Sequence, residues 1–268
     1  MYIVPPMTRS STDTDSKFKT CFGDAATYAH YYNVMGNISV EDFKRHNDIT
    51  DITEHIGDLQ VRHGKDMYNE IINMNMIDEC TIHRLVELND KHGNAIRLKI
   101  VDSLCKCSPN SIKYIYYGLL VVKHMLELKL SNVDFVEVGG GYGGQCVILN
   151  ELFKMFGIQI NKYISIDLDN VVKFQERYVA LCGPYDKCEF ISYEQYKSYS
   201  FSKDSYLLSS YCLSELGDDT RKDYYDNLLH YTPHGLIIWN NPYCVDLPKN
   251  YTEISHSCHD IVGKFLKF

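Results

Sequence analysis

The chain has 268 residues, which is long enough to bury a full hydrophobic core as one large domain or two unequal ones. Hydrophobic residues make up 45% and charged residues 23%, as in a globular protein. The formal net charge of -8 and the pI near 5.7 argue against a nucleic-acid partner, because a protein that binds a phosphate backbone normally carries a basic face.

Neither a membrane span nor a signal peptide is expected. The most apolar stretch, Tyr114 to Val122, is far shorter than the roughly 20 residues that a membrane helix needs. The N-terminus has two prolines followed by polar residues where a signal peptide would carry its apolar run. Its 10 cysteines are scattered without CxxC repeats, so we expect reduced, mostly buried thiols in a cytoplasmic protein.

The N-terminal part of the chain is predicted to be helical. Residues 1–20 are rich in Ser, Thr and Asp and are expected to form a mobile tail. Residues 21–108 are expected to form a helical region that covers a cleft, contacts the acceptor or forms a homodimer. Its predicted helices span 40–44, 67–76 and 82–88, the last opened by Thr81 as a cap.

From residue 109 to 268, strands alternate with helices. A first helix is predicted over 111–130, with Ser108 or Asn110 as its cap. Strands are predicted at 135–138, 163–167, 189–192, 206–210 and 236–240, and the helices between them at 145–156, 170–181 and 220–230. This alternation indicates an α/β, Rossmann-like, doubly wound and mainly parallel sheet. Few residues follow the fifth strand, so a closing antiparallel hairpin must be very short or partly missing.

The most informative segment is VDFVEVGGGYGGQ, residues 133–145, in which an apolar run breaks into five glycines within six positions. Such a strand, glycine turn and helix let a backbone approach a ligand closely. Glu137 lies just before the turn. Asp167 ends the next strand, where a carboxylate can accept hydrogen bonds from both hydroxyls of a ribose. The pattern predicts a cofactor that contains adenosine.

The glycine pattern alone leaves other functions open. Gly139, Gly141 and Gly144 satisfy GxGxxG, so an NAD(P)-dependent oxidoreductase is one alternative, and a non-catalytic nucleotide-binding module is another. Tyr193 and Lys197 imitate the YxxxK pair of short-chain dehydrogenases. They follow the third strand directly, which is too early for that catalytic helix, so we interpret the pair as coincidental.

Several segments together are similar to one family. They are DFVEVGGGYGGQ, YISIDLDNVVKFQERYV and LLSSYCLSEL, preceded by LVELNDKHGN and SPNSIKYIYYGL. In this order, over roughly residues 80–245, they resemble the sugar O-methyltransferase family of class I S-adenosylmethionine-dependent methyltransferases. The resemblance implies that S-adenosyl-L-methionine is the cofactor and that the acceptor is a hydroxyl of a nucleotide sugar or of a glycan residue.

The resemblance also implies roles for individual residues. Those at the methionine end of the cofactor would be Glu137, Gly139, Gly141 and Gly143, with Gln145 completing the same element. The ribose would be held by Asp167 and the adenine would lie against Leu168, with Ser192 and Tyr193 at the edge of its ring. Ser210 and Tyr211 would lie where cofactor and acceptor meet.

A sugar hydroxyl is a weak nucleophile, so a general base or a metal is expected to assist. Base candidates are Asp90 and His92 of NDKHG, with Asp90 orienting His92, and Glu215 of SYCLSEL. Further base candidates are the late histidines His230, His234, His256 and His259. The ends of the fourth and fifth strands carry neutral Ser210, Tyr211, Asn240 and Asn241, which suit a divalent cation poorly. We therefore expect no metal. Glu215, Asp218 and Asp219 could form a substitute cluster, but we interpret them as a solvated charge group at a helix start. Tyr114, Tyr116 and Tyr117 are candidate acceptor-side residues.

Overall fold

The computed structural model describes residues 25–46, 58–239, 245, 247–255 and 263–268. The predicted tail, Asn240, Asn241, His256 and His259 lie outside these residues. A seven-stranded sheet forms the centre of the fold, in the order β3-β2-β1-β4-β5-β7-β6. The strands are β1 (Val133–Val138), β2 (Ile160–Asp167), β3 (Cys188–Ser192), β4 (Ser205–Ser210), β5 (His234–Trp239), β6 (Thr252–Ile254) and β7 (Lys264–Lys267).

Strands β1 to β5 pair in parallel, and β7 is antiparallel to both β5 and β6. This arrangement confirms the predicted Rossmann-like, mainly parallel sheet. The closing hairpin is very short, since β6 has 3 residues and β7 has 4. The neighbours β1 and β2 continue to β3 on one side and to β4 on the other, so the order reverses beside β1, where ligands bind in sheets of this kind.

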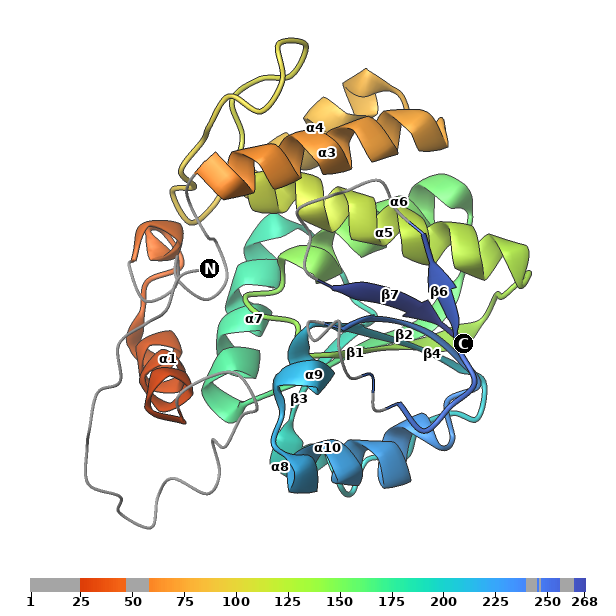
Figure 1. The fold of residues 1–268 in the computed structure, drawn as a ribbon. Coiled ribbons are helices and arrows are strands. Elements are labelled where there is room, and N and C mark those ends of the chain that lie inside the picture. The colour runs from red at the N-terminus through yellow and green to blue at the C-terminus, as the bar shows by residue number, and fades with distance from the viewer. Residues whose placement is uncertain (1–24, 47–57, 240–244, 246, 256–262) are drawn as a thin grey trace.

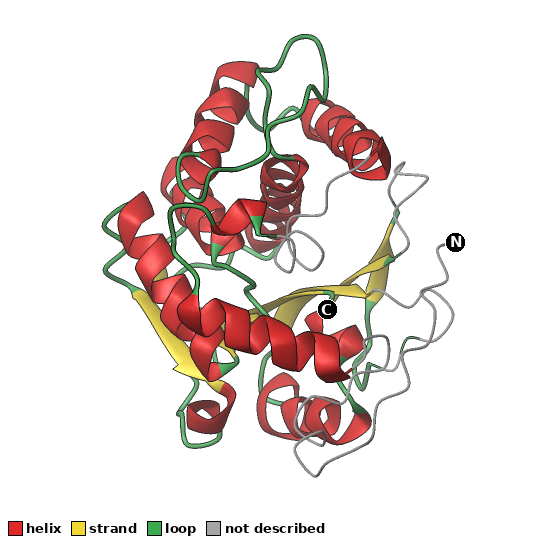
Figure 2. Ribbon diagram, turned by 90° about the vertical axis from the view of Figure 1, so that its left-hand side faces the viewer, coloured by secondary structure: helices red, strands yellow, loops and turns green. Residues whose placement is uncertain are grey.

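Helices cover both faces of the sheet (Figures 1 and 2). They are α1 (Ala25–Asn37), η2 (Phe43–Arg45), α3 (Asp58–Met74), α4 (Glu79–Asp90), α5 (Pro109–Glu127), α6 (Gly144–Phe156), α7 (Asp169–Cys182), α8 (Tyr193–Tyr196), α9 (Cys212–Glu215), α10 (Asp218–Tyr224) and the π-helical turn η4 (Tyr225–Leu229). In Figure 1, α5, α6 and α7 lie on one face and α8, α9 and α10 on the other. The helices α3 and α4 form a further layer outside α5.

The helix boundaries follow from local capping, with some corrections to the sequence prediction. Asp78 caps α4 by accepting from the Thr81 N–H at 2.8 Å, so Thr81 is not the cap. Ser108 caps α5, with Pro109 at its first position. The predicted helix 40–44 is only the 3-10 helix η2. The predicted helix 220–230 is α10 followed by η4.

The core lies on both faces of the sheet because side chains alternate along each strand. Phe135, Tyr163 and Tyr206 pack on the face covered by α5, α6 and α7. Val136 and Ile164 pack on the opposite face, against the helices after β3. Among the described residues, no helix combines the length and the apolar character that crossing a membrane requires.

Candidate active site

The glycine turn leads from the carboxyl end of β1 into α6, and its backbone takes conformations that favour glycine. Gly139 has φ of 81° and Gly143, at the start of α6, has φ of 96°. A Cβ at Gly139 would lie 2.2 Å from the Cβ of Cys212. Gly139 therefore packs directly against the start of α9, after β4, and that close approach requires a glycine at this position.

Glu137 lies beneath the turn rather than at its open edge. Glu137 is 2% exposed to solvent, and the Tyr163 hydroxyl donates a hydrogen bond to Glu137 Oε2 at 2.7 Å. Burial raises the pKa of the Glu137 carboxyl to about 7. A Cβ on Gly140 would come within 3.0 Å of Glu137 Oε2. This carboxyl therefore supports the turn from inside.

Asp167, at the end of β2, is bound to the same turn. Leu168 N donates to Asp167 Oδ1 at 2.8 Å, and Gln175 Nε2 donates to Oδ2 at 3.2 Å. The same Gln175 amide donates to the Gly141 carbonyl at 2.9 Å, and its Oε1 accepts from Ser165 Oγ at 2.8 Å. Burial raises the pKa of Asp167 to about 7, with the hydrogen bonds from Leu168 and Gly141 opposing it. A carboxylate and a glycine turn thus meet at the carboxyl edge of the sheet.

The end of β4 combines backbone strain with an unpartnered hydroxyl. Tyr211 has φ of 68° and ψ of −31°, an unfavourable conformation for a residue other than glycine. Its hydroxyl lies 2.5 Å from that of Tyr117 on α5. Ser210 Oγ is buried and has no hydrogen-bond partner among the described residues. Strain and an unsatisfied polar atom are features that recur where ligands bind.

The charges of three carboxyl groups act on the thiol of Cys212, the first residue of α9. Burial raises the pKa of this thiol, and Asp167, Glu215 and Glu137 raise it further by their charge. Glu215 ends α9 and is half-buried. Among the base candidates that the structure describes, Glu215 therefore acts electrostatically on the same thiol as Asp167 and Glu137.

Asp90 and His92, the predicted orienting pair, contact different parts of the fold. Asp90 accepts from Ser108 N at 2.7 Å and from Ser111 Oγ at 2.5 Å, so its carboxylate closes the N-terminus of α5. The His92 ring lies against the backbone of Leu181, and its burial lowers its pKa. The helix α7 begins at Asp169, just after Asp167, and rises 1.5 Å per residue, so Leu181 lies about 18 Å further along it. His92 therefore contacts the far end of α7. His92 Nε2 is buried and has no hydrogen-bond partner among the described residues, and the catalytic role of His92 stays a prediction.

Other predicted residues have partners within the fold. Gln145 is 2% exposed and donates to the Tyr114 carbonyl at 3.0 Å, so it points toward α5. Ser192 accepts from Gln195 N in a capping box on α8. Leu168 is the N-cap residue of α7, and its side chain packs on the core. The glycines of the turn itself, by contrast, lie at the carboxyl edge of the sheet, after β1.

The dehydrogenase-like pair also has a structural explanation. Tyr193 donates to Asp223 at 2.9 Å, and the Lys197 ammonium lies 4.6 Å from the Tyr193 ring centre and 3.9 Å from Asp223. The predicted acceptor-side tyrosines are core residues: Tyr116 is 1% and Tyr117 0% exposed. Tyr117 reaches the end of β4 through its hydroxyl, 2.5 Å from that of Tyr211, and through an edge contact of the two rings at 6.3 Å.

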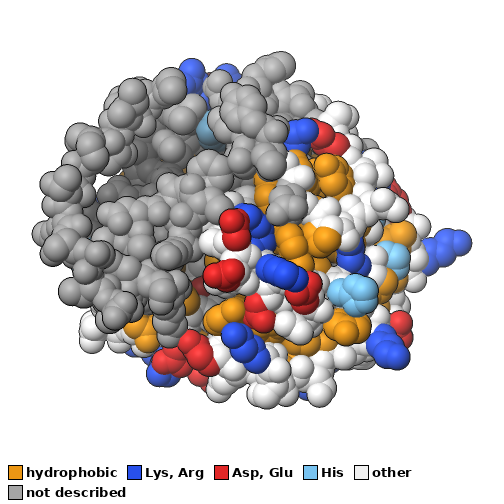
Figure 3. Space-filling view, turned by 60° about the horizontal axis from the view of Figure 1, so that its bottom comes forward, with side chains coloured by type: hydrophobic (Ala, Val, Ile, Leu, Met, Phe, Trp, Pro, Cys, Tyr) orange, Lys and Arg blue, Asp and Glu red, His pale blue; other side chains and the backbone are white. Residues whose placement is uncertain are grey.

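The described residues contain no grouping of three or more His, Cys, Asp or Glu side chains that could hold a metal ion. Asp218, at the start of α10, is 87% exposed and pairs with Arg221 at 2.5 Å. Figure 3, which brings the α8 and α10 side forward, shows acidic and basic side chains interspersed on the described part of that face. Two of the predicted base candidates, His230 and His234, are also described. The rings of His230 and Tyr231 form an edge contact, and His234 begins β5, at the amino end of the parallel strands, whereas the glycine turn lies at their carboxyl end.

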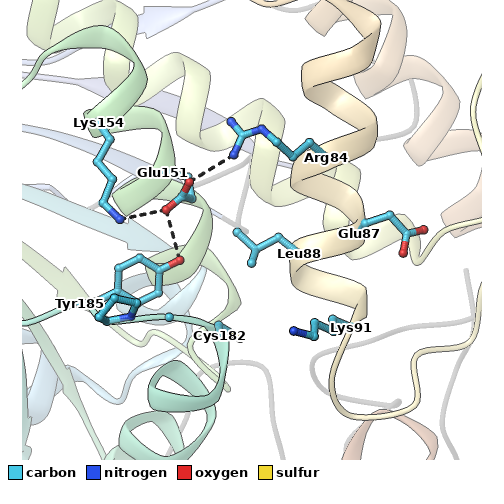
Figure 4. A pocket seen from close by; sticks show the side chains of 10 residues that line it. Arg84, Glu87, Leu88, Lys91, Glu151, Lys154, Cys182 and Tyr185 are labelled. Atoms are coloured by element: carbon cyan, nitrogen blue, oxygen red, sulfur yellow. Dashed lines mark hydrogen bonds and ion pairs between the residues drawn. The ribbon is translucent and has the colours of Figure 1, made fainter.

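A surface groove of about 400 Å³ lies elsewhere, between α4 and the ends of α6 and α7 (Figure 4). Glu151 lies at its centre and accepts from Arg84 at 3.2 Å, Lys154 at 3.0 Å and Tyr185 at 3.4 Å. None of the predicted site residues lines it. The groove is therefore separate from the candidate active site.

Sequence reasoning missed the groups that support the site. Gln175 and Ser165 bridge Asp167 to the turn, and Tyr163 holds Glu137. Tyr142, the one residue in the run 139–144 that is not glycine, is fully buried. Its position in the motif was a usable signal, because a large apolar ring amid glycines must pack somewhere.

No family model and no curated protein matches the sequence. An S-adenosylmethionine-dependent methyltransferase from Clostridium acetobutylicum aligns with 53% of this chain at 13% identity and a TM-score of 0.38. The N-methyltransferase NodS from Bradyrhizobium japonicum, in complex with S-adenosyl-L-homocysteine, aligns with 57% at 11% identity and a TM-score of 0.42. PKMT2 from Rickettsia typhi, in complex with AdoHcy, aligns with 42% at 10% identity and a TM-score of 0.34.

The aligned parts cover 57% of the C. acetobutylicum chain, 84% of NodS and 22% of PKMT2. Such low identities leave function to be argued from the residues of this chain.

Proposed function

We propose that this protein is an S-adenosyl-L-methionine-dependent O-methyltransferase whose acceptor is a sugar hydroxyl, in a nucleotide sugar or a glycan residue. The observation that carries the proposal is Asp167 at the end of β2, bonded through Gln175 to the glycine turn that follows β1. An adenosine cofactor requires a carboxylate that can bind its ribose and, beside it, a glycine turn that its other parts can approach closely. Both lie here where the strand order reverses.

The residues present fit the cofactor. Gly139 and Gly143 leave the turn without side chains at positions of positive φ, so the backbone can approach a ligand. Asp167 accepts from Leu168, Gln175 and the Gly141 backbone, so its carboxylate, with about four lone-pair positions, keeps one that can accept from a ribose hydroxyl. Ser210 Oγ, buried without a partner among the described residues, offers a further polar contact. Gly139, Gly141 and Gly143 would line the methionine end.

The chemistry asks little of the protein beyond alignment and proton removal. When bound, the cofactor supplies an activated methyl group on a sulfonium. In this proposal Glu215 would accept the proton of the acceptor hydroxyl, whose oxygen would replace the sulfur on the methyl carbon, with S-adenosyl-L-homocysteine as the leaving group. General-base assistance of this kind contributes roughly 100 to 10,000-fold. Tyr211, half-buried at the end of β4, contacts the acceptor and helps to exclude water.

The sugar acceptor and the lack of a metal are finer parts of the proposal. The sugar acceptor rests on the family resemblance of the motifs. Metal independence rests on donor chemistry, since Ser210 and Tyr211 offer only hydroxyls at the end of β4, and hard divalent cations prefer carboxylates. We place acceptor contacts in residues 21–108 and leave open a homodimer through the same region.

Calorimetry with three ligands tests the cofactor assignment: S-adenosyl-L-homocysteine, S-adenosyl-L-methionine and NAD⁺. The proposal predicts binding of the first two and none of NAD⁺. Tight NAD⁺ binding alone would indicate an oxidoreductase. Binding of the methyl donor without transfer to any acceptor in a panel of nucleotide sugars and glycans would indicate a non-catalytic module. Transfer that persists after EDTA treatment would support metal independence.

A further inference from the structure

The charged side chain of Lys44 is buried on the outer side of the glycine turn. Lys44 lies in η2 of the N-terminal region and is 0% exposed to solvent. Its Nζ donates to the Asn89 carbonyl at 2.5 Å and lies 3.5 Å from the Tyr178 hydroxyl. Enclosing an ammonium is expensive unless it is well paired, so a lysine in this position has a specific structural or functional role.

Three aromatic rings surround the Lys44 ammonium. The ring centres lie at 4.8 Å for Tyr142, 5.3 Å for Tyr178 and 5.5 Å for Phe43. Cations within about 6 Å of a ring centre are attracted to its face, more strongly when they are desolvated. Tyr142 belongs to the glycine turn itself, so the ammonium joins the N-terminal region to the candidate cofactor site.

Tyr142 is the only side chain by which the turn could be fixed from this side. It stands between Gly141, with φ of 57°, and Gly143, with φ of 96°. Glycines restrict their backbone poorly, so the position of the ring between them is a second restraint on both, beside the hydrogen bond from Gln175 to the Gly141 carbonyl at 2.9 Å. The Tyr142 hydroxyl accepts from Asn89 Nδ2 at 3.1 Å, and its ring packs edge-on to Phe43 at 5.0 Å.

Asn89 connects the same parts through its backbone and side chain. Its carbonyl accepts from Lys44, and its side-chain amide donates to Tyr142 and to Ser111 Oγ at 2.8 Å. The Tyr178 hydroxyl donates to the Asn89 carbonyl at 2.9 Å. Lys44, Asn89, Tyr142 and Tyr178 therefore bring η2, α4, the glycine turn and α7 to one buried point.

From this geometry we propose that Lys44 is a positioning residue for cofactor binding, which acts through Tyr142 to hold the glycine turn in its binding conformation. The proposal rests on the proposed function, because it assumes that the turn binds the cofactor. It makes the N-terminal region a supporting part of the cofactor site rather than only a cover for the acceptor.

The first test removes the charge while keeping the length of the side chain. Lys44→Met should weaken S-adenosyl-L-homocysteine binding at least tenfold by calorimetry. In the ligand-free protein it should also speed hydrogen exchange in the peptide that spans 139–145. Tyr206→Phe, which deletes a buried hydroxyl 3.0 Å from His124 Nδ1 near the other edge of the sheet, is the control for general loss of stability. It should leave both quantities unchanged.

A double variant tests whether Lys44 acts through the tyrosine. If it does, Lys44→Met should weaken binding less than threefold in a Tyr142→Leu background, because the ring that it holds is gone. Should Lys44→Met not fold, Phe43→Leu removes one wall of the same box and should weaken binding and speed exchange in the same way.

The outcomes separate this inference from the proposed function. Unchanged affinity in Lys44→Met, or in Phe43→Leu if that variant is used, with faster exchange spread over the whole chain, would show that Lys44 serves stability alone and would overturn the inference. If the wild type binds no cofactor, the proposed function fails, while the exchange of 139–145 still decides whether Lys44 holds the turn.

Discussion

Replacing Asp167 by Asn removes the charge at the end of β2 and keeps the shape of the side chain. The amide retains an oxygen that can accept from Leu168 N, now 2.8 Å from Oδ1, so the start of α7 should be preserved. What is lost is an ionised acceptor for the ribose hydroxyls, together with the acceptor that Oδ2 offers to Gln175 Nε2. Hydrogen bonds to charged groups contribute about 1.5 to 3 kcal/mol, so the Kd of S-adenosyl-L-homocysteine should rise by about 10- to 150-fold.

The pKa of Asp167 adds a pH dependence to this prediction. Because burial raises the pKa to about 7, only about a tenth of the groups is ionised at pH 6, and nearly all are ionised at pH 8. If the ribose binds the ionised form, wild-type affinity should rise by up to about tenfold from pH 6 to pH 8. The Asn variant should bind weakly with a flatter pH profile.

Calorimetry at pH 6, 7 and 8 on the wild type, Asp167→Asn and Asp169→Asn measures both effects. Asp169 is the matched control: it lies two positions later, its side chain is 43% exposed, and it pairs with Lys173 at 2.7 Å. Exposed ion pairs contribute little, so its loss should leave the Kd within about twofold. Equal affinity of Asp167→Asn and wild type at pH 8 would refute the assignment of Asp167 to the ribose.

Three further predictions concern the turn and the base. Glu137→Gln should raise the Tm at pH 8, by an amount corresponding to up to about 3 kcal/mol, and have little effect near pH 5. The carboxyl, whose folded pKa is about 7, makes the wild type less stable as pH rises from about 4.5 to 7. An equal Tm of Glu137→Gln and wild type at pH 8 would contradict this prediction. Gly139→Ala should abolish cofactor binding, measured by calorimetry, because its Cβ would lie 2.2 Å from that of Cys212. Gly157→Ala, with φ of 67° and open space around it, is the control and should bind normally. Glu215→Gln should lower kcat by roughly 100 to 10,000-fold with the cofactor Kd unchanged; wild-type turnover would exclude Glu215 as the base.

The strand, glycine turn and helix were predictable because their signals are local. The apolar run before Gly139 and the helical spacing after Gly144 each lie within a few residues of the turn. Asp167 was predictable for the same reason, since it ends the next apolar run. The closing hairpin was uncertain because β6 and β7 are too short to carry a periodic pattern.

The contacts that support the site could not be predicted, because they depend on register and on packing between distant segments. Tyr163 reaches Glu137 across neighbouring strands, which requires knowledge of how β1 and β2 align. Asp90 and His92 are close in sequence, yet Asp90 turns to α5 and His92 to the end of α7. Sequence proximity suggested a pair that the tertiary structure separates.

Lys44 illustrates a similar limit. A lysine in a short polar segment is expected to be solvated, and only the fold reveals that it is 0% exposed among aromatic rings. The residues that surround it come from η2, α4, the glycine turn and α7.

The most direct test of the central claim is methyl transfer itself. The protein is incubated with methyl-labelled S-adenosyl-L-methionine and a panel of nucleotide sugars and glycans, and the products are read by mass spectrometry. The account predicts label on a hydroxyl of at least one sugar, together with formation of S-adenosyl-L-homocysteine. If the protein binds neither the methyl donor nor its demethylated product, and no labelled sugar forms, the account is contradicted.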